Sequence, residues 1–600
     1  MRYSKTAEMM EHFPYDVHPN PRVSQIVAVE RMEMQNGLVT LELPTGGGKG
    51  AVGMTLLREG EANGEQNLHY IVPNKTQVEQ LQQQFPEVKV AMGRCEHKCL
   101  YYGPEHPFRA DEVPCLLLAD CPHRVNQETG ETFEPNAEPC PYYREKFLAK
   151  QGGIVVQTMA FYLFTHLLAK EFEPADRLVI DEAHRIAEVF RGALSYEITD
   201  HHLRRSIEFL QEIGATEDAR KLKRFLVVMV SLIRKRRPHS KTLLENDEII
   251  QLINILAEVD DRKLKTTIAA AIKSGQINTV EKREILKKIE TLIYSLRRYL
   301  LSLEYSRFDE KRSALNYTYA YYEEEKSEGQ KVQHKLVVKG YYVAPLIQKV
   351  LAPKTLAMSA TIGNPEYFGF ETGIKSPFFA MESDFPPKNT RIFLPTDNAD
   401  LSFNKRSRQD LNRTLRRMIR SAKRFAKSGT RSLIVVNSEE ERGKVIAFSL
   451  EEGLDLVSYG KGIHAREALA RFKDGEGDAL VGTAAHYGEA VDLPKGLAQV
   501  IFFLRPGYPN PNDPMAQFED RKFPQGHKWA LWKWRVMIQA LQVRGRNMRS
   551  KKDKGVTFFM SSQFENLLYH AMPEELRSKQ VFFKDKTFDE CVAEAELLLQ

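Results

Sequence analysis

The stretch LELPTGGGKG (residues 41–50) decides the fold of this chain. It places three glycines and Lys49 between an apolar run that predicts a strand and AVGMTLLRE, which has helical character. Glycines let backbone N–H groups approach phosphate oxygens, a helix N-terminus favours negative charge, and an ammonium group neutralises phosphate. We therefore expect a nucleotide site here, although a glycine-rich turn with an exposed lysine is the structural alternative. Its expected residues are Thr45, Gly46, Gly47, Gly48, Lys49 and Gly50.

Short apolar runs recur along the chain, bounded by polar or glycine-rich residues and separated by helical patterns. They cover residues 37–44, 67–74, 152–158, 176–184, 354–361, 432–438, 478–484, 498–504 and 555–561. Strands buried on both faces and separated by helices are typical of parallel α/β sheets. Their two clusters predict two α/β domains, which suits a chain of 600 residues with 42% hydrophobic content.

An acidic pair ends one of these strands, in VIDEAH (179–184). Ligands bind at the carboxyl ends of parallel strands, so Asp181 would hold Mg²⁺ through water and Glu182 would polarise the water that attacks the γ-phosphate. A helix cap is the simpler use of such a pair, but the upstream glycine loop favours the nucleotide site. One departure is Gly50, which stands where a Ser or Thr hydroxyl usually coordinates Mg²⁺.

Two regions interrupt the α/β pattern. Residues 95–142 are rich in Cys, Pro and charge, and residues 197–335 are helical by pattern, most clearly over 281–303. Both look like insertions into the first α/β domain. A basic stretch at 404–427 predicts a surface helix whose charged face is either solvated or in contact with phosphates.

Bulk properties leave the partner open. The formal net charge of +6 permits a nucleic-acid partner without requiring one. No run of about eighteen apolar residues occurs and the first residues show no signal pattern, so we expect a cytoplasmic protein with no membrane contact. Five of the six cysteines lie between Cys95 and Cys140, which favours metal binding or redox chemistry over disulfides. Their spacing alone leaves zinc and iron–sulfur equally open.

Six motifs in order resemble the superfamily 2 DNA helicases of the XPD/DinG type, nearly end to end. LPTGGGKG is similar to motif I, DEAH (181–184) to motif II and SAT (359–361) to motif III. GTAAHYGEAVDLP (482–494) looks like motif V, with Glu489 and Asp492 at its acidic positions and Ala490 where the family usually has Gly. QVRGRNMRSKKDKG (542–555) matches motif VI, with Gln542, Arg546 and Arg549. FPYDVHPNPRVSQ (13–25) resembles the adenine-reading Q motif, with Gln25 as the base contact.

This resemblance implies two RecA-like parallel-sheet motor domains, with a small iron–sulfur insertion and a helical arch-like insertion in the first. The implied divisions are motor domain 1 (1–94, 143–196 and 336–384), iron–sulfur insertion (95–142), arch-like insertion (197–335) and motor domain 2 (385–600). The arch and the iron–sulfur insertion would leave a hole for one DNA strand. The basic run RKRR (234–237) would contact phosphates or end a solvated helix.

The resemblance also implies the ligands of the cysteine region. Cys99, Cys115, Cys121 and Cys140 would hold a [4Fe–4S] cluster, which leaves Cys95 spare. The neighbouring tyrosines would either stack on bases or pack around the cluster; they are Tyr101, Tyr102, Tyr142 and Tyr143.

The implied activity is that of an ATP-dependent 5′→3′ helicase that translocates on single-stranded DNA, acts at DNA junctions and serves repair or replication. ATP and Mg²⁺ would be bound by Lys49 and Asp181, and Glu182, Gln542, Arg546 and Arg549 would complete the catalytic set. The rival hypothesis is a helicase-fold nucleic-acid-binding protein that has lost ATP turnover because Gly50 cannot bind Mg²⁺. No carboxylate-rich motif supports a nuclease.

Overall fold

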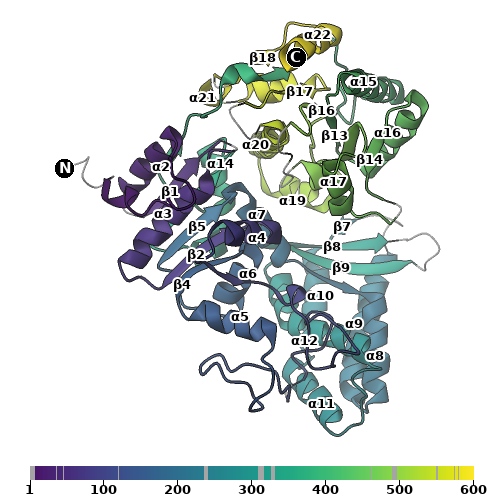
Figure 1. The fold of residues 1–600 in the computed structure, drawn as a ribbon. Helices are drawn as coiled ribbons and strands as arrows, with labels where there is room; N and C mark the ends of the chain where they lie inside the picture. The colour runs from purple at the N-terminus through teal and green to yellow at the C-terminus, as the bar shows by residue number, and fades with distance from the viewer. Residues whose placement is uncertain are drawn as a thin grey trace.

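The computed structural model of the protein describes residues 7–600 except 36, 45, 119, 236–240, 308–316, 326–331, 461, 489–492, 494–495, 549–551, 573 and 579. Thr45, Glu489, Asp492 and Arg549 therefore lie outside the described residues, as do the last two residues of the basic run 234–237. Two parallel α/β sheets and a helical region make up the molecule (Figure 1).

Motor domain 1 is built on a seven-stranded parallel sheet in the order β11-β1-β10-β5-β2-β4-β3. Its strands are β1 (Leu38–Glu42), β2 (Asn67–Val72), β3 (Lys89–Ala91), β4 (Gly153–Thr158), β5 (Arg177–Asp181), β10 (Lys354–Ser359) and β11 (Phe378–Ala380). One face packs on α2 (Val23–Glu33), α3 (Lys49–Ala62) and α4 (Lys75–Gln84). The other packs on α6 (Met159–Leu163), α7 (Ile186–Ala193), α13 (Ala344–Gln348) and α14 (Pro365–Thr372).

Motor domain 2 repeats this plan with the order β14-β15-β13-β16-β17-β12-β18. Its strands are β12 (Thr390–Phe393), β13 (Ser432–Val436), β14 (Leu456–Ser458), β15 (Ala479–Thr483), β16 (Val500–Phe503), β17 (Gly555–Phe559) and β18 (Phe582–Phe583). One face packs on α15 (Arg408–Lys427), α16 (Glu439–Glu452) and α22 (Phe588–Leu599). The other packs on α17 (Ala465–Lys473), α18 (Ala484–Tyr487) and α20 (Gln525–Arg544). The expectation of two RecA-like domains is confirmed.

The expected basic surface helix is α15. Its arginines pair with carboxylates of neighbouring elements, as in Arg416 with Glu451 (2.6 Å) and Arg420 with Glu452 (2.9 Å). These pairs join α15 to α16, so much of the basic face serves contacts within motor domain 2.

The insertion between α7 and β10 contains the expected helices and also a sheet that its helical pattern did not predict. The helices are α8 (Asp200–Glu212), α9 (Thr216–Arg234), α10 (Asn246–Leu256), α11 (Asp261–Lys273) and α12 (Arg283–Glu304). The sheet is antiparallel in the order β6-β9-β8-β7, from β6 (Tyr196–Thr199), β7 (Thr242–Leu243), β8 (Thr318–Glu325) and β9 (Gln333–Gly340). The expectation of an all-helical insertion was therefore incomplete, because its two ends pair as strands.

Side chains alternate between the two faces of this sheet, as the period of a strand requires. Ala320, Tyr322 and Leu336 pack on the helices of the insertion. Tyr319 and Tyr321 face the opposite way, in a cluster with Phe518 of α19 (Pro514–Lys522) in motor domain 2. The base of the insertion therefore contacts both motor domains.

The cysteine segment, residues 95–140, is mostly irregular and lies against α12. The backbone N–H of Leu116 donates to Glu290 Oε2 (2.6 Å), and Arg283 Nη1 donates to the carbonyl of Glu112 (2.7 Å). The same guanidinium stands 4.1 Å from the ring centroid of Phe108. The two insertions of motor domain 1 therefore touch each other.

Candidate nucleotide site

The glycine loop between β1 and α3 has a shape that side chains would disturb. Gly46 and Gly48 take left-handed φ angles of 77° and 78°, which glycine adopts at little cost. A Cβ on Gly47 would stand 2.9 Å from the carbonyl oxygen of Pro44. The N-cap residue of α3 is Gly48, which has no side chain to cap the helix, and Lys49 is the first helical residue. A helix that begins in this way favours an anion at its N-terminus.

The Q-motif residues hold this loop. Gln25 Oε1 accepts from the backbone N–H of Arg22 (2.8 Å), and Gln25 Nε2 donates to the carbonyl of Gly48 (3.2 Å). The Arg22 guanidinium donates to the carbonyl of Gly46. Gln25 thus supports the phosphate loop directly, and its contact with adenine stays a prediction.

The acidic pair at the end of β5 faces Lys49. Lys49 Nζ lies 3.1 Å from Glu182 Oε1. Tyr70 OH donates to Asp181 Oδ2 (3.2 Å), and the N–H of Glu182 donates to Asp181 Oδ1 (2.8 Å). Glu182 has a left-handed φ of 51°, which costs a residue with a Cβ about 1–3 kcal/mol. Strain of this kind gathers at functional sites, where surrounding contacts fix the side chain.

The pKa values of the two carboxyl groups are shifted in opposite directions. Burial alone would raise the pKa of Glu182, but Lys49, His184 and Arg546 outweigh it and hold that pKa at about 2. Burial and the negative charge of Glu182 raise the pKa of Asp181 to about 6, against the opposing effect of Lys49. Glu182 is therefore an ionised acceptor at neutral pH.

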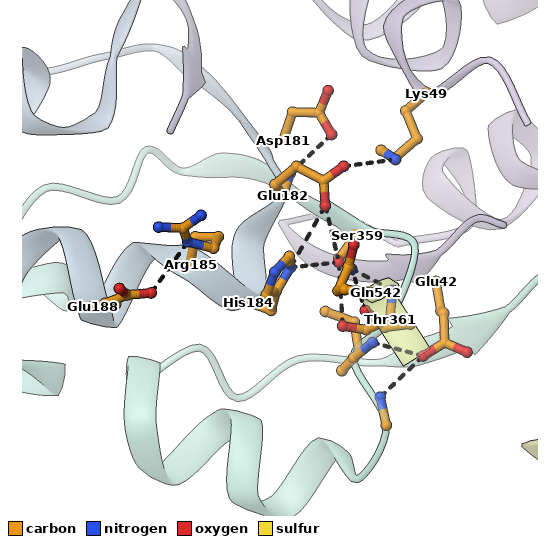
Figure 2. Close-up of polar contacts among 12 residues, drawn as sticks. Glu42, Lys49, Asp181, Glu182, His184, Arg185, Glu188, Ser359, Thr361 and Gln542 are labelled. Carbon is orange, nitrogen blue, oxygen red and sulfur yellow. Dashed lines mark hydrogen bonds and ion pairs between the residues drawn. The ribbon is translucent and has the colours of Figure 1, made fainter. Parts of the chain in front are cut away.

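A polar chain leads from this acidic pair to motor domain 2 (Figure 2). His184 Nδ1 and Ser359 Oγ lie 2.8 Å apart, and the N–H of Thr361 donates to Ser359 Oγ (3.1 Å). Gln542 Nε2 in turn donates to Thr361 Oγ1. The SAT residues after β10 thus connect the DEAH residues of motor domain 1 to α20 of motor domain 2.

Arg546 continues the chain on the side of motor domain 2. Its Nη2 donates to Gln542 Oε1 (3.1 Å), and its Nε donates to the carbonyl of Gly488 (3.3 Å). Arg546 is buried, and a small pocket between the domains is lined by residues of both, including Glu182, His184, Gln542 and Arg546. The structure therefore brings together five expected residues, namely Lys49, Asp181, Glu182, Gln542 and Arg546.

Sequence reasoning missed two side chains of this site. Tyr70 lies inside the apolar run that forms β2, where nothing distinguishes it from a core residue. His184 was visible as the last letter of DEAH, but its hydrogen bond to Ser359 depends on two strands that are adjacent only in the folded sheet.

Gly50 has room for a side chain. A Cβ built there would meet its nearest neighbours at 3.7 Å, which is ordinary van der Waals contact; they are Leu81, Gln84 and Phe85. Residue 50 thus lacks the hydroxyl because it is a glycine, and not because the fold leaves no room for a Cβ there.

Four of the five clustered cysteines share one environment. Cys140 is buried, Cys99, Cys115 and Cys121 are partly buried, and Cys95 is exposed. Burial, and then the proximity of the other three thiols, raise the pKa of Cys99 to about 11. The pKa of Cys95 is raised mainly by burial, by a hydrogen bond to Glu96 and by the charges of Glu96 and Asp111.

This thiol set fits the expected ligands, but the side chains do not form a finished metal site. Within the described ranges, no three Cys, His, Asp or Glu side chains are grouped closely enough to hold a metal ion. The cluster therefore stays a prediction. Tyr102 and Tyr142 are buried, which favours packing over base stacking for these two tyrosines.

Comparisons with known proteins agree with these motifs. A model of the helicase C-terminal domain matches residues 417–579, and the DEAD_2 family model matches residues 75–203. A probable ATP-dependent helicase of Methanocaldococcus jannaschii is 25% identical over 240 residues, which cover 36% of this chain and 36% of that protein. The chain thus matches about a third of the length of this curated relative.

Solved structures match over nearly the whole chain. A structure described as an XPD helicase superposes with a TM-score of 0.62 at 17% identity, covering 94% of this chain and 99% of that one. The structure of S. tokodaii Xpd4 has a TM-score of 0.55 at 14% identity, covering 97% and 99%. At these identities the likeness shows the fold. No helix in the described part of the chain is long and apolar enough to cross a membrane.

Proposed function

We propose that this chain, an XPD/DinG-type superfamily 2 helicase in sequence and fold, uses ATP hydrolysis to move 5′→3′ along single-stranded DNA and to open duplexes at junctions. The observation that carries the proposal is the interdomain pocket, where Glu182 of one motor domain, paired with Lys49, lies near Arg546 of the other. A nucleotide bound there would touch both domains, so its hydrolysis would change how they sit together.

Each residue of the pocket has a role that its chemistry supports. Lys49 and the N-terminus of α3 would bind the phosphates. On binding, the Lys49 ammonium would leave its ion pair with Glu182 and contact phosphate oxygens instead. Glu182, freed from Lys49 and still ionised, would accept a proton from the attacking water. Arg546 would neutralise charge that develops on the transferred phosphoryl group. Asp181 would hold Mg²⁺ through water, and the ion would supply further charge neutralisation.

The residues outside the described ranges complete the proposed site. By the motif match, Arg549 would be a second arginine finger, while Thr45, Glu489 and Asp492 would bind the nucleotide.

The contact between the two insertions supports a closed path for one strand. The Leu116–Glu290 and Glu112–Arg283 hydrogen bonds join the cysteine segment to α12, so a strand passing between them and motor domain 1 would be enclosed. Cys99, Cys115, Cys121 and Cys140 would hold the [4Fe–4S] cluster, which would cross-link a segment with little regular structure of its own. We place this activity in the cytoplasm, in DNA repair or replication.

The rival function is a helicase-fold protein that binds nucleic acid without turning over ATP. Its only structural support is Gly50, and Mg²⁺ readily keeps several waters in its octahedral shell. A water in place of the hydroxyl would meet no obstruction, because a Cβ at Gly50 lies 3.7 Å from its nearest neighbours. The geometry therefore favours turnover.

Unwinding of tailed duplexes tests the proposal. Two DNA substrates of one duplex sequence carry a single-stranded tail on the 5′ or the 3′ side. With ATP and Mg²⁺, the wild-type protein is expected to open the 5′-tailed substrate, while Glu182→Gln binds it without opening it. Equal opening of both substrates would reject the polarity, and binding without any unwinding would favour the rival.

A further inference from the structure

Five residues from three parts of the chain form a closed circuit of hydrogen bonds outside the nucleotide pocket. Motor domain 1 contributes Arg191 from α7 and Glu371 from α14. Motor domain 2 contributes Glu519 from α19 and Arg535 from α20. The insertion contributes Tyr341, which directly follows its last strand, β9.

Hydrogen bonds close the circuit at every step. Arg535 donates to Glu371 Oε1 through Nη2 (2.7 Å) and to Glu519 Oε1 through Nη1 (2.8 Å). Tyr341 OH donates to the same Glu519 oxygen (2.8 Å), and its carbonyl accepts from Arg191 Nε (2.7 Å). Arg191 Nη2 completes the ring by donating to Glu371 Oε2.

Burial makes this circuit hard to break. The side chains of Glu371 and Glu519 are 4% and 1% exposed. Burial alone would raise the pKa of Glu371, but Arg191 and Arg535 outweigh it and hold that pKa at about 2. A buried carboxylate that loses its guanidinium partner is left uncompensated. Sliding of the domains past each other here would break such pairs, whereas rotation about the circuit keeps them.

Two helices connect the circuit to opposite sides of the nucleotide pocket. The turn Ala183–Arg185, which includes the last two DEAH residues, leads directly into helix α7, and α7 carries Arg191. Helix α20 carries Arg535 and, seven residues further on, Gln542, which lies about 10 Å along the axis at a rise of about 1.5 Å per residue. A rotation at the circuit therefore changes the gap between Glu182 and Arg546.

The insertion is tied to motor domain 2 at this point through Tyr341. Its ring centroid lies 4.8 Å from that of Phe518 on α19, next to its hydrogen bond with Glu519. A cavity of about 700 Å³ borders the circuit and is lined by residues of α7, β9, α19 and α20, which leaves space for movement.

We propose that this circuit is the pivot of the ATP-driven rotation, and that the Tyr341 hydroxyl makes the insertion turn with motor domain 2. The inference deepens the proposed function, on which it rests, because it names how nucleotide binding moves the insertion that encloses the strand. Tyr341 acts through Glu519 and is a positioning residue.

Energy transfer between two dyes measures this movement directly. One dye is attached at Met34 in motor domain 1 and one at Val227 in the insertion, both exposed, through genetically encoded azides that spare the cysteines. A non-hydrolysable ATP analogue with Mg²⁺ is expected to change the transfer efficiency in the wild-type protein. Tyr341→Phe, which removes only the hydroxyl, is expected to lose at least half of that change.

The neighbouring Tyr342 provides the matched control. Its ring packs 5.9 Å from that of Phe370, and its hydroxyl makes no hydrogen bond to any residue that the structure describes, so Tyr342→Phe is expected to keep the full change. A wild-type protein without a nucleotide-dependent change, or a Tyr341→Phe variant with the full change, would overturn the pivot.

Coupling assays separate this inference from the proposed function. Tyr341→Phe is expected to stay folded with a lowered melting temperature, because it loses a buried hydrogen bond to a carboxylate, and to keep DNA-stimulated ATPase activity, but to hydrolyse at least threefold more ATP per base pair opened. Equal losses of ATPase and unwinding would indicate a purely structural role and reject the inference. Absence of DNA-stimulated ATPase in the wild-type protein would reject the proposed function, while the dye measurement would still decide the pivot.

Discussion

The two motor domains share one plan and divide the chemistry between them. Each is a seven-stranded parallel sheet with helices on both faces. Motor domain 1 places a glycine loop after β1 and an acidic pair at the end of β5, whereas motor domain 2 contributes Gln542 near the end of α20 and Arg546 from the turn that follows it. The difference indicates how the proposed chemistry would be divided: motor domain 1 would bind the nucleotide, and motor domain 2 would supply the positive charge that hydrolysis requires.

Removing one side chain from each motor domain is expected to affect different steps, namely hydrolysis for motor domain 2 and ATP binding for motor domain 1. Arg546→Ala is expected to lower kcat for ATP on the order of 10³-fold, since an arginine finger acts on the transition state, and to leave ATP binding nearly unchanged. Lys49→Ala is expected to weaken ATP binding itself. Steady-state kinetics with equilibrium binding of a fluorescent ATP analogue measures both. A matching loss of ATP affinity in Arg546→Ala would contradict the division.

The insertions are a second asymmetry, because both belong to motor domain 1. Anaerobically purified protein is expected to be brown and to hold about four irons per chain. Serine in place of Cys99, Cys115, Cys121 or Cys140 is expected to lose nearly all of this iron. Cys95→Ser is the matched control and is expected to keep it, because Cys95 is exposed whereas the other four thiols are buried or partly buried. Stoichiometric zinc in a colourless preparation would overturn the cluster.

The link between the domains can be weakened without touching either catalytic group. Thr361→Val removes the acceptor of the Gln542 hydrogen bond, which is worth about 0.5–1.5 kcal/mol, and is expected to reduce DNA stimulation of the ATPase roughly twofold to tenfold. Thr396→Val is the control, since its hydroxyl donates a hydrogen bond to the carbonyl of Lys586 (3.3 Å) outside the pocket. Equal DNA stimulation of the ATPase in the two variants would show that the Thr361–Gln542 hydrogen bond has no role in coupling the domains.

The smallest effect is expected at Gly50. Gly50→Thr adds a hydroxyl for Mg²⁺ in a place with room for its Cβ, and is expected to lower the Mg²⁺ concentration for half-maximal ATPase about twofold to tenfold. Gly50→Ala adds the Cβ alone and serves as the control. An equal shift in both variants would assign the effect to the helix and not to the metal.

The strands of both motor domains were predictable because parallel strands buried on both faces appear as continuous apolar runs. All nine runs contain a strand, from β1 to β17. The pattern of 281–303 likewise predicted α12, which spans Arg283–Glu304. The antiparallel sheet of the insertion was missed because β6 pairs with β9 across more than a hundred residues of intervening helix and strand.

Site residues that belong to sequence motifs were predictable, whereas residues placed by packing between distant segments were not. Lys49, Glu182 and Arg546 follow from motif order, and the structure places Glu182 and Arg546 around one pocket with Lys49 paired to Glu182. Glu371 and Glu519 lie on helices where a carboxylate usually faces water. Only the folded arrangement shows that each is buried against Arg535, which no local pattern encodes.

Steady-state ATP hydrolysis with and without single-stranded DNA tests the central claim most directly. The account predicts that DNA stimulates hydrolysis by the wild-type protein, and that Glu182→Gln binds ATP and DNA but loses nearly all turnover in both conditions. A wild-type protein that binds both ligands yet hydrolyses no ATP at any Mg²⁺ concentration would contradict it, as would a Glu182→Gln variant with normal turnover.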